Sequence, residues 1–355
     1  MESTTTGYLE GDVFFRHYID YTNKTDYLDA GVTLIVLTFL LNVAVIAVIV
    51  YLYVKRPTVT NQAPHFIPML ACCVAEILEG VFDSVFFHML RVRRYGEGFD
   101  LSCRETIALD LVAFILATLP LLLVAAVIFT QAVRLQRVMI LTRVVQKIVA
   151  VVLVMLSVVY VVVVLIAVYY MTFLKDNTKV CVEDSRGTEY ANYQSKRSKI
   201  RVMLAVDYIV PSLLILLSCL VLLLAHFVLN YRTTDTGTLT STSTQSPGPT
   251  AIPSFPFNVL LAAASCIILY LVLFLFSFKD FQFGPIGSRI RLAGITLKQL
   301  NGVFLPCFWL LDADIRALWC CCGKASRATP ECVTLESSEG RRMEDGGDNR
   351  NGTRL

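Results

Sequence analysis

The stretch FIPMLACCVAEILEGVFDSVFFHML, residues 66–90, decides the fold, because it has the length and apolarity of a membrane helix yet carries three carboxylates. These are Glu76, Glu79 and Asp83. At about 100° per residue, the three acids fall within roughly 60° of one another on one helix face. A carboxylate at the bilayer centre costs on the order of 3 kcal/mol. We therefore expect this face to meet protein, water or an ion, and the other apolar segments to shield it from lipid.

The composition is that of an integral membrane protein. Of 355 residues, 55% are hydrophobic and 17% are charged, and the mean hydropathy is +0.63. A net charge of +3 gives no reason to expect nucleic-acid binding. Many of the 11 cysteines lie within apolar runs, unlike those of a disulfide-stapled secreted scaffold. No cleavable signal peptide is expected, and the first span would serve as its own signal.

Seven mostly apolar segments are long enough to cross about 30 Å of hydrocarbon. They lie at roughly 29–54, 66–90, 106–131, 146–173, 203–230, 257–279 and 289–311. The second, third and seventh contain charges and are expected to face one another. The predicted fold is an all-α membrane protein with a seven-transmembrane helix bundle. This bundle and a short amphipathic eighth helix occupy residues 29–322, between an extracellular N-terminus (1–28) and a disordered cytoplasmic tail (323–355).

The signals for orientation disagree. Asn23-Lys24-Thr25 is an acceptor sequence for glycosylation in an acidic segment, which favours an N-terminus outside the cell. Counting lysines and arginines opposes this, because the loops that would lie outside hold more of them. Cys103 and Cys181 would lie on the same side and could oxidise there to a disulfide. We expect the N-terminus outside, with a chance acceptor sequence and two free thiols as the alternatives.

A short amphipathic helix is predicted after the seventh span. Ile315, Leu318 and Trp319 have the spacing of one apolar face, so the helix would lie along the membrane. Three cysteines follow where acyl chains could anchor that helix, with unmodified cytosolic thiols as the alternative. They are Cys320, Cys321 and Cys322.

Several short motifs carry a resemblance to a known family. They are Asn42 within Leu41–Ile46, Glu76 within Leu70–Leu78, Cys103 and Cys181, Pro211, and Leu305-Pro306-Cys307-Phe308-Trp309. Together they resemble the motifs of rhodopsin-like seven-helix G-protein-coupled receptors, with Glu76 in the place of the sodium-site aspartate. The resemblance implies the Cys103–Cys181 disulfide and an amphipathic helix followed by palmitoylated cysteines.

The chain departs from the family where activation and G-protein engagement are expected. The third span ends Val127-Ile128-Phe129-Thr130-Gln131-Ala132 instead of carrying Asp-Arg-Tyr, and Cys266-Ile267-Ile268-Leu269 replaces Cys-Trp-x-Pro. A narrower set of motifs resembles the orphan seven-helix receptors of betaherpesviruses, the cytomegalovirus group. This set comprises Asn42, Lys55-Arg56-Pro57, Cys103-Arg104 followed by Asp110, and Gly302-Val303-Phe304-Leu305-Pro306.

Two interior sites are predicted. In the deeper one, Asn42, Glu76 and Asn301 would form a polar centre similar to the family's sodium pocket. Either sodium binds at Glu76, or a protonated Glu76 is hydrogen-bonded to one of the asparagines. In the higher one, Lys298 would pair with an acid because an unpaired buried charge is far more expensive than a paired one, although the charges could only fix helix register. The acids are Glu79, Asp83 and Asp110.

The expected function is that of a divergent, viral receptor-like protein at the plasma membrane and endosomes of a host cell, with the virion envelope as a further location. It would bind an unidentified extracellular ligand or partner, with atypical or absent coupling to heterotrimeric G proteins. The alternatives are a transporter or channel that uses the interior charges, and a scaffold that forms homo- or hetero-oligomers with seven-helix receptors. The lipid bilayer is an expected partner and nucleic acid is not. No nucleophile motif or metal spacing indicates an enzyme, and no cofactor is expected.

Overall fold

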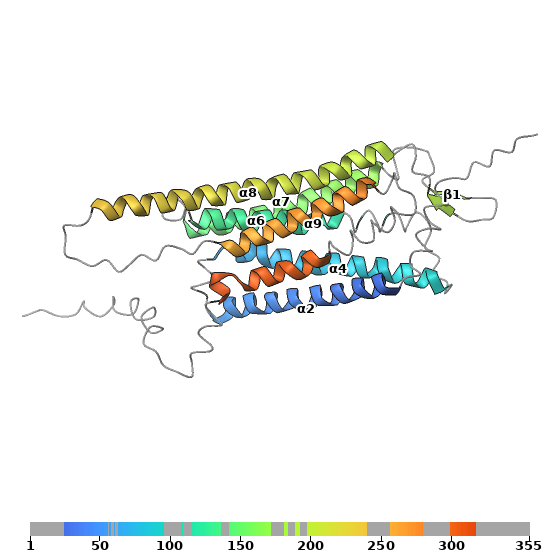
Figure 1. The fold of residues 1–355 in the computed structure, drawn as a ribbon, viewed down its shortest axis with the longest axis horizontal. Coiled ribbons are helices and arrows are strands. Elements are labelled where there is room, and N and C mark those ends of the chain that lie inside the picture. The colour runs from blue at the N-terminus through green and yellow to red at the C-terminus, as the bar shows by residue number, and fades with distance from the viewer. Residues whose placement is uncertain are drawn as a thin grey trace, which may run out of the picture. The chain divides into compact units, whose positions relative to one another are not determined.

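The computed structural model describes residues 25–55, 57, 60, 63–95, 108, 112, 115–135, 142–171, 181–183, 189–191, 197–239, 256–279 and 299–316. Six long helices dominate this part of the chain (Figure 1). They are α2 (Thr25–Lys55), α4 (Phe66–Tyr95), α6 (Thr118–Leu135), α7 (Arg143–Tyr169), α8 (Arg197–Leu239) and α9 (Phe257–Lys279). A further helix covers residues 299–310 and is called the 299–310 helix below.

Four helices are long and apolar enough to cross a membrane. They contain the spans Gly31–Lys55, Thr118–Leu135, Arg143–Tyr169 and Val206–Tyr231. A shorter apolar helix covers Phe257–Leu269. The chain therefore has the character of a helical membrane protein, as its composition predicts, whereas the number of seven spans stays a prediction.

The third predicted span is interrupted by a turn. Residues 108, 112, 115 and 116 are helical ahead of α6, and its other residues before 115 lie outside the described part of the chain. A turn at Ala117 precedes α6, and the Thr118 hydroxyl donates a hydrogen bond of 2.7 Å to the Ile115 carbonyl. Pro120 has no N–H to donate to the carbonyl of residue 116, so the turn at Ala117 lies where one helical hydrogen bond is lost. The start of the span at residue 106 stays a prediction.

Two short strands follow α7. β1 (Cys181–Glu183) pairs antiparallel with β2 (Glu189–Ala191), with Cys181 opposite Ala191.

The chain divides into two units, Met1–Asp312 and Ala313–Leu355. In the second unit, residues 313–316 are helical, which covers the start of the predicted amphipathic helix. Leu318, Trp319 and the following cysteines lie outside the described residues.

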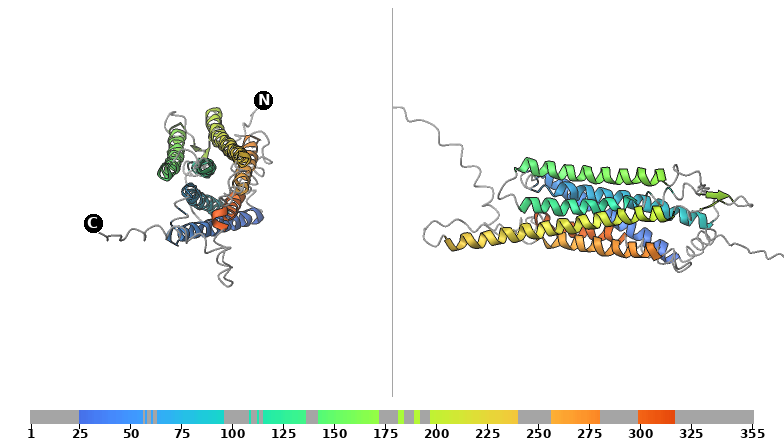
Figure 2. Two further views of the ribbon diagram at one scale, coloured as in Figure 1. Left: turned by 90° about the vertical axis from the view of Figure 1, so that its left-hand side faces the viewer. Right: turned by 90° about the horizontal axis from the view of Figure 1, so that it is seen from above.

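Of the four apolar spans, α6 is the most enclosed. It packs against α4, α7, α8 and α9, and the view along the helices shows it among them (Figure 2). Of its membrane span, 72% is buried, against 17–22% for the other three spans. A helix that is apolar on every side is stable only where all its faces leave water, and α6 achieves this by burial in protein.

In α7 the apolar side chains are largely exposed on the protein surface, and not buried in protein as they are in α6. Its outer face exposes a row of large aliphatic side chains, among them Met155, Leu156, Val163 and Ile166. An exposed apolar row of this length is expected to contact lipid, not water. A smaller inner face, with Val161 and Val168, packs on Ile115 and Leu122.

This difference predicts the outcome of a matched pair of substitutions. Leu123 of α6 is 1% exposed and Leu156 of α7 is 58% exposed. Leu123→Ala should lower the free energy of unfolding by about 2–5 kcal/mol, because it leaves a cavity in a packed core. Leu156→Ala should cost much less, because lipid fills the space. Thermal unfolding of both variants in detergent micelles measures the difference, and equal losses would contradict the assignment of the two faces.

Candidate functional site

A buried asparagine joins α2 to the 299–310 helix. The Asn42 side chain is fully buried, and its Nδ2 donates hydrogen bonds to the carbonyl oxygens of Thr38 at 2.8 Å and Gly302 at 3.2 Å. The first bond lies within α2, whereas the second joins residues 260 positions apart. An amide that satisfies a backbone carbonyl in an apolar interior stabilises that helix pair.

Gly302 lies in close contact with side chains of two other helices. A Cβ atom placed there would lie 2.6 Å from Thr38 Cγ2, 2.8 Å from Thr38 Oγ1 and 2.9 Å from Glu76 Oε2. Thr38 belongs to α2 and Glu76 to α4, and both are buried. The absence of a side chain at Gly302 therefore lets the three backbones meet around the Glu76 carboxylate.

Asn301 reaches a different neighbour. Its Oδ1 and Nδ2 both lie 3.5 Å from Cys266 Sγ in α9, and Ser265 Oγ donates to Oδ1 at 3.5 Å. Successive helical residues point about 100° apart, so Asn301 faces α9 where Gly302 faces α2. The predicted polar centre thus spreads over two contacts: Asn42 and Glu76 meet at Gly302, and Asn301 binds α9. Sodium binding at Glu76 stays a prediction.

The higher predicted cluster is described only in part. Glu79 is buried in α4, with 5% of its surface exposed. Asp83 lies in α4, but its side chain is not among those described. Asp110 and Lys298 lie entirely outside the described residues. The predicted pairing of Lys298 therefore stays a prediction.

The predicted modification sites also lie largely outside the described residues. This holds for Asn23, Cys103 and the run Cys320–Cys322, and the structure describes Cys181 through its backbone in β1. The Cys103–Cys181 disulfide, the glycosylation and the lipidation therefore stay predictions.

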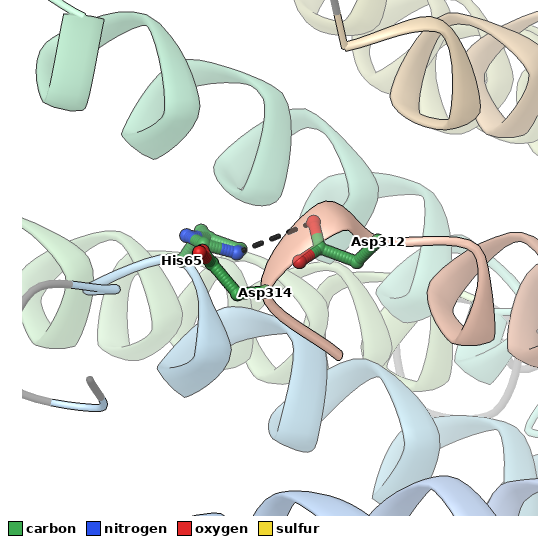
Figure 3. Close-up of side chains that lie close together, drawn as sticks. All are labelled: His65, Asp312 and Asp314. Carbon is green, nitrogen blue, oxygen red and sulfur yellow. Dashed lines mark ion pairs between the residues drawn. The ribbon is translucent and has the colours of Figure 1, made fainter. Parts of the chain in front are cut away.

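A buried polar cluster at one end of the helices was missed from the sequence. His65 Nε2 lies 3.5 Å from Asp312 Oδ2 (Figure 3). Gln131 Nε2 donates a hydrogen bond to the same oxygen at 3.5 Å. His65 immediately precedes α4, Gln131 lies in the last turns of α6, and Asp312 follows the 299–310 helix. All three are at most 8% exposed. The available signal was one polar residue at the same end of each of three apolar segments.

Asp207 of α8 is a second buried acid that was missed. It is 1% exposed, and the Tyr160 side chain of α7 is near enough to interact with its carboxylate. Within the described ranges the carboxylate oxygens make no hydrogen bond of good geometry. The signal in the sequence was an acid one helical turn before Pro211, inside an apolar span.

No protein-family model matches the chain, and no curated protein matches it.

The three-helix contact at Gly302 predicts a strong dependence on side-chain size. Gly302→Ala should lower the free energy of unfolding by about 1–3 kcal/mol, because the added methyl group overlaps Thr38 and Glu76. Thr38→Ala should restore part of this loss, because it removes two of the three closest atoms. Thermal unfolding of the single and double variants in detergent measures both effects.

Gly80 provides the matched control. It lies within α4, and a Cβ there would meet only Ile35 Cγ2, at an ordinary 3.8 Å. Gly80→Ala should be neutral or should stabilise α4 by up to about 1 kcal/mol, since alanine is the better helix former. Equal destabilisation by the two glycine substitutions would refute the close contact at Gly302.

Proposed function

We propose that the chain is a divergent seven-helix membrane protein of the G-protein-coupled-receptor type, which binds an extracellular ligand or partner and travels between the plasma membrane and endosomes. The observation that carries this proposal is the hydrogen bond from Asn42 to the Gly302 carbonyl. It joins the two segments whose sequences resemble the first- and seventh-helix motifs of rhodopsin-like receptors. The similarity to betaherpesvirus orphan receptors makes an infected host cell part of the proposal.

The packing around Glu76 favours a receptor over a transporter or channel. A path for ions or protons along the acidic stripe would need water beside Glu76. Instead, Glu76 is 5% exposed, and its Oε2 would lie within 2.9 Å of a Cβ at Gly302. The helices are thus in van der Waals contact at the point where the stripe begins.

The end of α6 favours atypical or absent coupling to G proteins. Rhodopsin-like receptors carry Asp-Arg-Tyr here, whereas this chain has Val127-Ile128-Phe129. Val127 and Ile128 have aliphatic side chains that carry no charge, and both are fully buried, so neither can contact a partner protein. The nearby Gln131 is used inside the protein, in the bond to Asp312.

Two assays on the purified full chain test the function. In proteoliposomes, proton and sodium fluxes should equal those of empty vesicles, because the Glu76 contact is closed. With heterotrimeric G proteins, ligand-free nucleotide exchange should stay well below that of a constitutively active rhodopsin-like receptor. A flux that Glu76→Gln abolishes would overturn the proposal in favour of a transporter or channel.

The orientation has its own test. Asn23→Gln should remove an endoglycosidase-sensitive mass shift from the chain expressed in mammalian cells, because an outer N-terminus passes through the glycosylating compartments. Electrophoresis before and after enzyme treatment measures the shift. Protease protection of an N-terminal tag in sealed, right-side-out vesicles would show instead that the N-terminus lies inside.

A further inference from the structure

We propose that His65, Gln131 and Asp312 form a latch, which holds the ends of α4, α6 and the 299–310 helix together on one face of the membrane. On the proposed function, with the N-terminus outside, this is the cytosolic face. That end of the protein would open to a cytosolic partner only when Asp312 separates from His65 and Gln131.

The convergence of three segments on one atom is the main support. Asp312 Oδ2 is the shared acceptor, 3.5 Å from both His65 Nε2 and Gln131 Nε2. The side chains come from positions far apart in the sequence, and each lies at the end of its helix. Movement of any one of the three helix ends away from the others therefore breaks at least one contact to this oxygen.

The backbone holds the side chains of His65 and Asp312 in place. His65 lies in a turn just before α4, and its backbone carbonyl accepts a hydrogen bond of 3.2 Å from the Met69 N–H. The His65 ring packs on the Phe66 ring, with 4.7 Å between the ring centroids. The Asp312 N–H donates to the Trp309 carbonyl at 3.0 Å, and the Trp309 side chain is fully buried. The side chains of His65 and Asp312 are thus attached to backbone segments that are held by hydrogen bonds and by packing against Phe66 and Trp309.

The contact distances make the latch releasable. Strong hydrogen bonds between nitrogen and oxygen have lengths of about 2.7–3.2 Å, so contacts of 3.5 Å are weaker. Burial acts in the opposite direction, because a carboxylate separated from its partners in an apolar interior must find water or another donor. The latch therefore opens together with the entry of water at this end, not by a small shift of one side chain.

Hydrogen–deuterium exchange of the full chain in lipid nanodiscs tests the latch without any G protein. Gln131→Leu removes the donor to Asp312, and it should accelerate backbone exchange in residues 63–69 and 127–135 by roughly three- to tenfold. Gln146→Leu is the matched control, because Gln146 is also a buried glutamine, in the first turn of the neighbouring α7. It should leave exchange in these segments unchanged.

A second variant, His65→Phe, tests the latch independently, in case Gln131→Leu does not fold. His65→Phe keeps a ring against Phe66 but removes the nitrogen that faces Asp312, and it should accelerate exchange in the same two segments. The double variant should exchange less than the product of the two single effects, because both substitutions break one unit. Exchange equal to that of the unmodified chain, or equal acceleration by Gln146→Leu, would overturn the latch. A missing G-protein response bears only on the proposed function, since the exchange readout needs no partner.

Discussion

The rest of the structure depends on the burial of a carboxylate, Glu76, inside an apolar helix. A charge or acid at this depth cannot face lipid without a large free-energy cost, so α4 needs protein neighbours on that side. α2 and the 299–310 helix provide them, through Thr38 and through the bare backbone at Gly302. Asn42 then ties these two neighbours to each other. The polar residues thus specify which helices are adjacent, whereas apolar packing alone would allow several arrangements.

Much of the fold is predictable because membrane helices obey a simple rule of length and apolarity. The four apolar spans follow from runs of Val, Leu, Ile and Phe, and α7 and α8 lie close to their expected positions. The helix boundaries were less predictable, because local chemistry sets them. Pro120 removes one helical hydrogen bond beside the turn at Ala117, and α8 continues to Leu239, past the end of its apolar run. Which span is enclosed was partly predictable, because the charge in the third span predicted contacts with other helices, and α6 is 72% buried.

The candidate sites show the same division. Asn42 and Glu76 were predicted as interior residues because a polar group in an apolar span needs a partner, and both are buried. The partner of Asn301 was not predictable, since Asn301 and Gly302 differ by one residue and hence face different helices. The cluster of His65, Gln131 and Asp312 was not predicted, because each residue alone is an ordinary polar group at a helix end. Their shared contact depends on how the helix ends are arranged in three dimensions.

The lipid-facing surface of α7 has a consequence for the membrane in which the protein resides. From Ile148 to Tyr169 the helix carries no charged side chain, a length of roughly 33 Å at 1.5 Å per residue. The hydrocarbon layer of the endoplasmic reticulum is about 27 Å thick, and that of the sterol-rich plasma membrane is about 32–33 Å thick. On the proposed function, hydrophobic mismatch would therefore be smaller at the plasma membrane than at the site of synthesis. Membrane thickness alone would then favour export of such a receptor from the endoplasmic reticulum, independently of any sorting signal.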